Sequence, residues 1–291
     1  MRIRKFLALL LALTAVSAVA LAEFDLSKTI AVVSREEGSG TRGAFIELTG
    51  VQTKNDEGKD VDNTYIEADF VNGTSLVITT VAQNDYAIGY ASLSAVLHND
   101  SVKMVRVNGV DATTEHILDG SYAIARPFNV VTKGELTDKL AIDFMTFVMS
   151  REGQEVVASD GLVPVANEET PSYTPAGLSG VLVVGGSTSV APVMELLGEA
   201  YAQLNPDVEV DVQSTGSTAG VTGALDGTYM IGMASRSLKN SEVEAGALGV
   251  AIGIDGIAVI TSTQNPVEDL SLEQVRQVFT GEITTWGGLS Q

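Results

Sequence analysis

Short runs of β-branched residues alternate with stretches of helical character along most of this 291-residue chain. A strand followed by a helix and a further strand builds parallel sheet with helices on its faces, so the alternation predicts an α/β fold with mostly parallel sheets. The length suffices for about two domains with buried cores. The predicted strands are 29–33, 86–90, 102–107, 181–184, 208–212, 230–233 and 254–260, and the predicted helices are 42–48, 74–82, 137–149, 153–158, 190–203, 218–225 and 272–279.

The first 22 residues have the pattern of a secretory signal peptide. Arg2, Arg4 and Lys5 precede the apolar run 6–19, and the small residues of 20–22 provide a cleavage site. The alternative, a membrane anchor, is disfavoured because a span needs about 20 apolar residues. We therefore expect an exported protein that is periplasmic, extracellular or at the cell surface.

Charge and cysteine content exclude several classes of protein. The net charge is −20, which argues against a nucleic-acid binder, because such a protein neutralises phosphates with a basic face. The chain has no cysteine. Disulfides, thiolate metal sites, a cysteine nucleophile and lipid attachment through an N-terminal cysteine are therefore excluded.

Three loops rich in Gly, Ser and Thr lie between a predicted strand and a predicted helix. They are Ser34–Arg42, Gly185–Val190 and Ser214–Gly220. The start of a helix offers unpaired N–H groups and a partial positive charge, and hydroxyls add further donors. One such loop is better explained by ordinary helix capping. Three of them, one carrying Arg35, indicate a pocket that surrounds a small oxyanion with neutral donors and a guanidinium.

Other chemistries fit the sequence less well. The segment 38–43 matches G-x-G-x-x-G literally, but 34–37 separates it from the strand, and Asp60 and Asp62 lie in a polar loop instead of at a strand end. The chain has no P-loop and no G-x-S-x-G motif, and neither of its two histidines belongs to a cluster with metal-ligand spacing. We expect no metal, no cofactor and no catalytic residue.

The first loop resembles the phosphate loop of the phosphate-binding proteins of ABC importers, the PstS family. Further segments resemble motifs of the same family, and together they cover almost all of the chain beyond residue 22. These segments are Gly186-Ser-Thr-Ser-Val190, Ile231-Gly-Met-Ala-Ser-Arg236, Ile254-Asp-Gly-Ile-Ala-Val259, Phe279-Thr-Gly-Glu-Ile-Thr-Thr-Trp286, Ala87-Ile-Gly-Tyr90 and Ala125-Arg-Pro-Phe128.

The resemblance implies a two-lobe, periplasmic-binding-protein-like fold of type II, in which two hinge strands join α/β lobes that close on the ligand. One lobe would be split, with residues 23–120 plus 255–291. The other would be contiguous, 121–254, and would contain a Pro-containing linker at 166–180. The crossover strands are expected near 122–131 and 255–260.

The order of the motifs differs from the usual order of the family. Family members usually begin with the Gly-Ser-Thr-Ser half, whereas here the half with Arg35 comes first. We therefore predict a circularly permuted chain in which the linker 166–180 joins the former termini, because rotation is physically cheap where termini lie close together. Exchange of halves between molecules and a gene-model error are the alternatives.

The resemblance also implies a phosphate site in the cleft. Arg236 occupies the position where many family members have an Asp that accepts a hydrogen bond from protonated phosphate and repels sulfate. We expect Asp255 to provide the acceptor instead; the alternative is that Asp255 only pairs with Arg236 or Arg35. The expected ligand-binding residues are Arg35, Ser39, Gly40, Thr41, Ser189, Val190, Ser217, Arg236 and Asp255.

The expected function is capture of inorganic phosphate for the membrane subunits of an ABC permease by a monomer that is not an enzyme. Two alternatives remain at this point. An enzyme acting on phosphate esters would need a nucleophile with a base, or a metal site. A non-transport oxyanion sensor or scaffold would have lost the ability to close.

Overall fold

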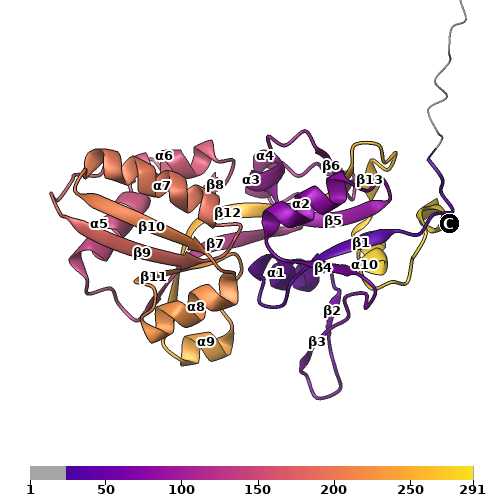
Figure 1. Ribbon diagram of the computed structural model, residues 1–291, viewed down its shortest axis with the longest axis horizontal. Coiled ribbons are helices and arrows are strands. Elements are labelled where there is room, and N and C mark those ends of the chain that lie inside the picture. The colour runs from indigo at the N-terminus through magenta and orange to yellow at the C-terminus, as the bar shows by residue number, and fades with distance from the viewer. Residues whose placement is uncertain (1–23, 291) are drawn as a thin grey trace, which may run out of the picture.

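The computed structural model describes residues 24–290, so the predicted signal peptide lies outside the described residues. Two α/β lobes lie side by side along the long axis of the molecule (Figure 1). The strands are β1 (Ala31–Arg35), β2 (Gln52–Lys54), β3 (Asp60–Asp62), β4 (Asp69–Val71), β5 (Ala87–Ser92), β6 (Val102–Val107), β7 (Ala125–Lys133), β8 (Val163–Pro164), β9 (Gly180–Gly186), β10 (Val208–Ser214), β11 (Ile231–Ala234), β12 (Ala247–Ser262) and β13 (Asp269–Leu270). The helices are α1 (Gly40–Leu48), α2 (Thr74–Ala82), α3 (Leu93–Val96), α4 (Thr114–Leu118), α5 (Lys139–Val148), α6 (Arg151–Ser159), α7 (Ala191–Leu204), α8 (Ser217–Asp226), α9 (Asn240–Glu244) and α10 (Leu272–Phe279), followed by a 3-10 turn at Trp286–Ser290.

The strands form one continuous path through both lobes, in the order β10-β9-β11-β7-β12-β5-β1-β4. Within each lobe the pairs β9–β10, β9–β11, β1–β4 and β1–β5 are parallel. The two long strands β7 and β12 pair antiparallel with each other and with their neighbours in the lobes. The prediction of mostly parallel sheets was therefore wrong, because the strands that cross between the lobes return in opposite directions and make the sheet mixed.

Two large hydrophobic cores correspond to the two lobes. The first core includes Phe45, Tyr90, Phe279 and Trp286, and the rings of Phe45 and Tyr90 are stacked with centroids 3.9 Å apart. The second core includes the buried aromatic side chains of α5 and α7 and extends to Phe128 of β7 and Ile252 of β12.

The change from one core to the other occurs on the two crossing strands. Ile124, the residue before β7, belongs to the first core, and Phe128 within β7 belongs to the second. On β12, Ile252 belongs to the second core and Ile257 to the first. The crossover strands therefore lie where they were predicted, although β12 begins earlier than expected, because its first residues pair with the end of β7.

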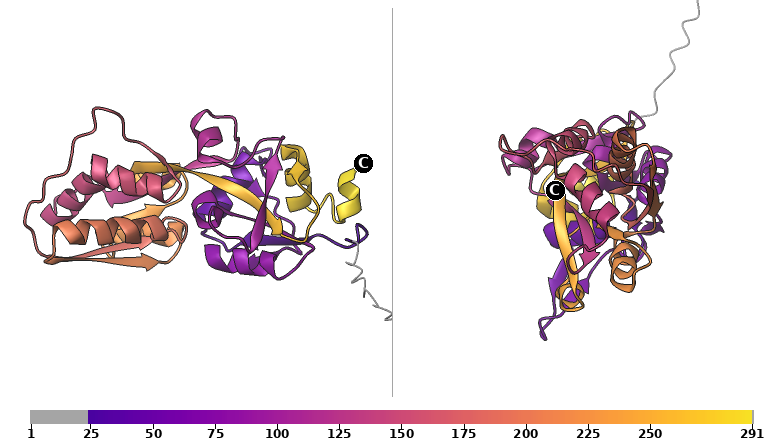
Figure 2. Two further views of the ribbon diagram at one scale, coloured as in Figure 1. Left: turned by 90° about the horizontal axis from the view of Figure 1, so that it is seen from above. Right: turned by 90° about the vertical axis from the view of Figure 1, so that its left-hand side faces the viewer.

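The linker 166–179 has no regular secondary structure, and it passes along the outer end of the lobe with the second core (Figure 2). Tyr173 anchors it: its ring is buried, and its hydroxyl donates to Asp143 Oδ2 over 2.5 Å. Asp143 Oδ2 also accepts from the Tyr201 hydroxyl over 2.6 Å. The linker is therefore part of the packed lobe.

The two ends of the described chain meet at the outer end of the other lobe (Figure 1). Thr29 and Thr285 form an isolated antiparallel bridge, and the Ile30 N–H donates to the Thr284 carbonyl over 2.8 Å. In a circularly permuted chain the two ends lie at neighbouring points of the fold, as these two ends do. The rotation itself stays a prediction.

All predicted strands and helices have counterparts in the structure, with ends shifted by at most two residues except at the start of β12, which lies seven residues earlier. Several helices begin at side-chain caps, which the sequence already suggests: Ser39 caps α1, Asp138 caps α5, Ser150 caps α6, and Ser271 forms a capping box with Gln274 at α10. The elements that the sequence does not predict are short ones, such as the exposed hairpin β2–β3, where the sequence predicts a polar loop. No helix within residues 24–290 is long and apolar enough to cross a membrane.

Candidate anion-binding site

The three Gly/Ser/Thr loops meet between the lobes. They follow the carboxyl ends of β1, β9 and β10 and lead into α1, α7 and α8. Thr41 Oγ1 and Ser189 Oγ lie 2.9 Å apart, and the Thr218 N–H donates to the Gly38 carbonyl over 3.1 Å. Residues more than 140 positions apart in the sequence are thus in contact, as the sequence predicted for these loops.

Glycines allow two of the loops to turn into their helices. Gly38, in the loop before α1, has a φ of 86°, and Gly216, just before α8, has a φ of 97°. Residues with a β-carbon rarely adopt such positive φ angles. The turns lie where the lobes meet, since the Thr218 N–H of α8 donates to the Gly38 carbonyl, and the start of a helix is suited to an anion.

Four hydroxyl side chains form a connected group, here called the hydroxyl cluster: Thr41, Thr74, Thr188 and Ser189. Ser189 Oγ lies 2.9 Å from Thr41 Oγ1 and 3.0 Å from Thr74 Oγ1, which lies 3.2 Å from Thr188 Oγ1. Thr41, Thr74 and Ser189 are buried and Thr188 is half-buried. Thr41 and Thr74 belong to one lobe and Thr188 and Ser189 to the other, so the cluster crosses the boundary.

A second group of hydroxyls lies beside the first in the contiguous lobe. Ser235 Oγ lies 2.9 Å from Ser187 Oγ and 3.3 Å from Ser217 Oγ, and the Ser235 N–H donates to Ser217 Oγ over 3.1 Å. All three side chains are buried. Ser217 was predicted from the sequence, whereas Ser187 and Ser235 were not assigned to the site.

Arg35 reaches across the boundary from the end of β1. Its side chain is 2% exposed, and its guanidinium donates to Thr74 Oγ1 over 3.3 Å and to Thr188 Oγ1 over 2.9 Å. Two further N–H groups bond to the Glu36 carboxylate, both over 2.7 Å. Burial raises the pKa of Glu36, but the hydrogen bonds and charge of Arg35 outweigh it, so this pKa is lowered overall.

The structure places a second buried guanidinium at the site. Arg126 of β7 donates to Thr41 Oγ1 over 2.7 Å and to the Ser235 carbonyl over 3.0 Å. Its Nη2 atom pairs with Asp255 Oδ2 of β12 over 3.0 Å. This segment resembles a family motif, but Arg126 is not among the site residues predicted from the sequence. One signal could have found it, because Arg126 is the one charged residue between Ala125 and Val131.

Asp255 lies behind Arg126, away from the hydroxyl cluster. Its carboxylate accepts hydrogen bonds from Arg126, from Ser92 Oγ over 2.8 Å and from the Ser94 N–H over 3.3 Å. Burial raises the pKa of Asp255, and the charge of Arg126 opposes the rise. The alternative considered for Asp255, pairing with Arg236 or Arg35, is not what the structure contains.

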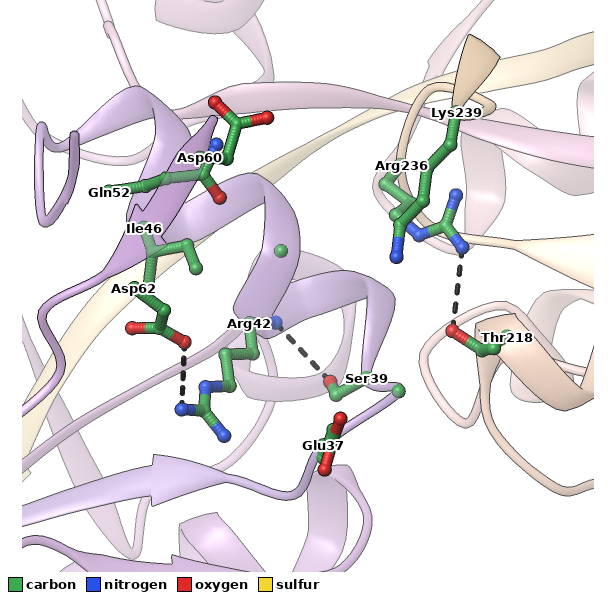
Figure 3. A pocket seen from close by; sticks show the side chains of 12 residues that line it. Glu37, Ser39, Arg42, Ile46, Gln52, Asp60, Asp62, Thr218, Arg236 and Lys239 are labelled. Carbon is green, nitrogen blue, oxygen red and sulfur yellow. Dashed lines mark hydrogen bonds and ion pairs between the residues drawn. The ribbon is translucent and has the colours of Figure 1, made fainter. Parts of the chain in front are cut away.

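Arg236 lies at the outer side of the site, where it lines a cavity of about 390 Å³ between the lobes (Figure 3). Its guanidinium pairs with Glu242 over 2.7 Å and reaches Thr218 Oγ1 at 3.5 Å. Across the cavity, Arg42 pairs with Asp62 over 2.8 Å (Figure 3). The charges around this cavity are therefore mostly paired.

The remaining predicted residues are positioned by local contacts. Ser39 Oγ accepts from the Arg42 N–H over 3.3 Å as the cap of α1. Val190 is buried, and its N–H points at the Ser187 carbonyl over 3.2 Å. Gly40 lies close against Ser217 of the other lobe.

The arrangement has the chemistry of an anion receptor: hydroxyls, N–H groups and two guanidiniums converge from both lobes. Within residues 24–290, no group of three or more His, Cys, Asp or Glu side chains is placed to hold a metal ion. The carboxylates beside the two arginines of the site, Glu36 and Asp255, are each bonded to one of those arginines.

Comparison with known proteins shows similarity along nearly the whole chain. The family described as PBP superfamily domain matches residues 20–152 and 166–288. The phosphate-binding protein PstS 2 of Streptococcus agalactiae serotype V is 46% identical over 263 residues, which cover 90% of this chain and 88% of that protein. PstS 2 of Streptococcus pneumoniae serotype 4 is 45% identical over 260 residues, which cover 89% and 87%.

A solved structure has the same fold. The crystal structure of a phosphate-binding protein of a phosphate ABC transporter from Streptococcus pneumoniae TIGR4 matches with a TM-score of 0.71 and 44% identity. The match covers 90% of this chain and 100% of that one. Because the sequence matches run in one order through nearly the full length of both chains, the streptococcal proteins share the motif order of this chain. A gene-model error is therefore not needed to explain that order.

Proposed function

Because this chain belongs to the PstS family of phosphate-binding proteins, we propose that it binds inorganic phosphate between its lobes and delivers it to the membrane subunits of an ABC transporter. One observation carries the proposal: Thr41 and Ser189, from different lobes, lie in hydrogen-bond contact beside the buried guanidinium of Arg35. Donors from both lobes at one point suit a small tetrahedral anion whose oxygens are all acceptors or weak donors.

The proposed binding residues come from both lobes. From the split lobe, 23–120 plus 255–291, we propose Arg35, Ser39, Thr41 and the Gly40 N–H. From the contiguous lobe, 121–254, we propose Ser189, Ser217 and the Val190 N–H. We propose a supporting position for Arg236 at the mouth of the site, because its guanidinium is bonded to Glu242 there. We propose a supporting position for Asp255 behind Arg126, because its carboxylate is bonded to that guanidinium.

Short hydrogen bonds provide the affinity, since long-range attraction does not favour an anion at a protein of net charge −20. A micromolar ligand needs about 8 kcal/mol. Charge-assisted hydrogen bonds contribute about 1.5–3 kcal/mol each, so a few well-directed ones suffice. Arg35 is suited to this role because its planar fork can bond two oxygens, and Glu36 holds it in place.

The remaining features of the proposal follow from sequence and family. We propose export through the signal peptide of residues 1–22, a periplasmic or cell-surface location without a cysteine-linked lipid, and a monomeric, non-enzymatic protein. The names of the relatives support a binding role over catalysis, since they are called phosphate-binding proteins.

Calorimetric titration of the protein lacking residues 1–22 with phosphate and with sulfate tests the proposal. We expect phosphate to bind with a dissociation constant well below millimolar, and Arg35→Ala to weaken it by about 100-fold or more through the loss of two charge-assisted bonds. Arg106→Ala, at an exposed arginine, is the matched control and should bind as the wild type does. No heat of binding with phosphate, from a protein shown to be folded by circular dichroism, would refute the function.

A further inference from the structure

Arg126 is fixed in one position by groups on opposite sides. Its Nε and Nη2 atoms bond to Asp255 Oδ2 over 3.3 and 3.0 Å, and Asp255 is itself bonded to the Ser92 hydroxyl. The guanidinium carbon also lies 5.2 Å from the centre of the Phe128 ring. Both charged side chains are at most 1% exposed. A guanidinium held in this way directs its two Nη1 N–H groups along fixed lines, one to Thr41 and one to the Ser235 carbonyl.

One Nη1 N–H group of Arg126 meets the hydroxyl of Thr41. The distance from Arg126 Nη1 to Thr41 Oγ1 is 2.7 Å, the shortest hydrogen bond that Arg126 makes. A guanidinium only donates, so Thr41 Oγ1 must accept. The hydroxyl proton of Thr41 is therefore directed away from Arg126, and Ser189 Oγ lies in contact on the other lobe.

The hydroxyl cluster has more protons than its internal contacts use. Its four hydroxyls carry four protons but are joined by three hydroxyl-to-hydroxyl contacts. Arg126 donates into one end of the cluster, and Arg35 donates into the other end, at Thr74 and Thr188. At least one hydroxyl proton is thus left over for an acceptor outside the cluster. A group with surplus protons complements an anion that brings acceptors.

We propose that Arg126 is a positioning residue of the phosphate site, which acts through Thr41 by forcing its hydroxyl to donate. This inference rests on the proposed function and adds to it a residue outside the three loops. The positive charge of Arg126 also polarises the Thr41 O–H, which strengthens the bond that this hydroxyl gives. Because Arg126 also bonds the Ser235 carbonyl of its own, contiguous lobe, it holds Thr41 of the split lobe in register with the loops that face it.

A double-mutant cycle on phosphate affinity tests this mechanism. The variants are Arg126→Gln, Thr41→Val and the two combined, each titrated with inorganic phosphate by calorimetry. We expect Arg126→Gln to weaken binding about tenfold in the wild-type background and less than about twofold in the Thr41→Val background, because the hydroxyl it orients is then gone. Equal effects in both backgrounds would overturn the proposal, since Arg126 would then act without Thr41.

Two further variants keep the test informative if Arg126→Gln alone does not fold. Replacing one member of a buried pair leaves the other charge uncompensated, so Arg126→Gln/Asp255→Asn removes both charges together. In that background the same dependence on Thr41 is expected. Arg126→Lys retains a donor and should recover part of the affinity; recovery also in the presence of Thr41→Val would contradict the mechanism.

The outcomes distinguish this inference from the proposed function. If the wild-type protein does not bind phosphate, the function fails. If the wild-type protein binds and the cycle is additive, only the role of Arg126 fails.

Discussion

Gly40 at the start of α1 and Ser217 at the start of α8 face each other across the two lobes with no room for a further carbon. A β-carbon on Gly40 would lie 2.2 Å from Ser217 Oγ and 2.8 Å from the Ser217 β-carbon. It would also lie 2.7 Å from Ser235 Oγ. Rotation of a hydroxyl does not relieve the contact with the β-carbon, so the approach of the two helices depends on glycine at position 40.

Gly40→Ala should therefore weaken phosphate binding about tenfold or more, because overpacking at a close contact typically costs about 1–3 kcal/mol. The thermal stability of the unliganded protein should change less than the affinity, because separation of the lobes relieves the contact and alanine is the better helix former. Gly43→Ala in the same helix is the control: its β-carbon would meet only Arg236 Cδ, at 3.5 Å. Wild-type affinity in Gly40→Ala would show that the lobes need not approach this closely.

Thr74 is a member of the hydroxyl cluster that the sequence analysis did not assign to the site. It bonds to Arg35, Thr188 and Ser189 and is 5% exposed. Thr74→Val keeps the shape and removes the hydroxyl, which leaves one N–H of Arg35 without its acceptor.

We expect Thr74→Val to lower phosphate affinity about tenfold, the value of one hydrogen bond to a charged group at about 1.5 kcal/mol. Thr79→Val, at an exposed position of the same helix, should leave the affinity unchanged. Titration calorimetry measures both. If the two variants bind alike, Thr74 has no part in the site.

Asp255 is expected to influence the choice between phosphate and sulfate. Its carboxylate is bonded to the guanidinium of Arg126, which in turn donates to Thr41. The carboxylate therefore adds negative charge behind the site. Sulfate has no proton to give at neutral pH and is disfavoured by that charge more than phosphate is.

Asp255→Asn should narrow the ratio of sulfate to phosphate dissociation constants several-fold, because the amide retains the shape and removes the charge. Competition titrations with both anions at neutral pH measure the ratio. Asp111→Asn at an exposed position serves as the control. An unaltered ratio in Asp255→Asn would mean that another residue discriminates.

Asp160, in the turn after α6, makes the stability depend on pH. Burial raises its pKa to about 6, the charge of Asp255 adds to the rise, and His98 opposes it. Its Oδ2 atom has no hydrogen-bond partner. Because the pKa is higher in the folded than in the unfolded state, this group stabilises the fold below about pH 4, and the contribution is lost as the pH rises through 6.

Asp160→Asn should therefore stabilise the protein at pH 7.5 and leave it nearly unchanged at pH 4. A shift of two pKa units corresponds to nearly 3 kcal/mol, and solvent screening at a half-exposed side chain reduces the expected gain to about 1 kcal/mol. Urea unfolding at both pH values provides the measurement, with the exposed Asp100→Asn as the control. A gain of equal size at both pH values would contradict the electrostatic explanation.

Much of the fold could be predicted from local sequence patterns. The loop before α1 is an example: a β-branched strand, two glycines with Ser39 between them and the helix-forming residues after Gly40 all act within about ten positions. The direction of the crossing strands could not be predicted in the same way. The antiparallel partner of Asp255 on β12 is Arg126 on β7, and nothing local to either strand determines that pairing.

Local sequence patterns are enough to predict three helix starts that carry Gly, Ser and Thr, because turn geometry and capping depend on neighbouring residues. Which side chains meet at these helix starts depends on the packing of the two lobes. Arg126 and Thr41 are 85 positions apart, and Thr74 and Ser189 are 115 apart. Contacts at such separation form only when the two lobes pack along β7 and β12, since hydrogen bonds require positions accurate to fractions of an ångström that no local pattern specifies.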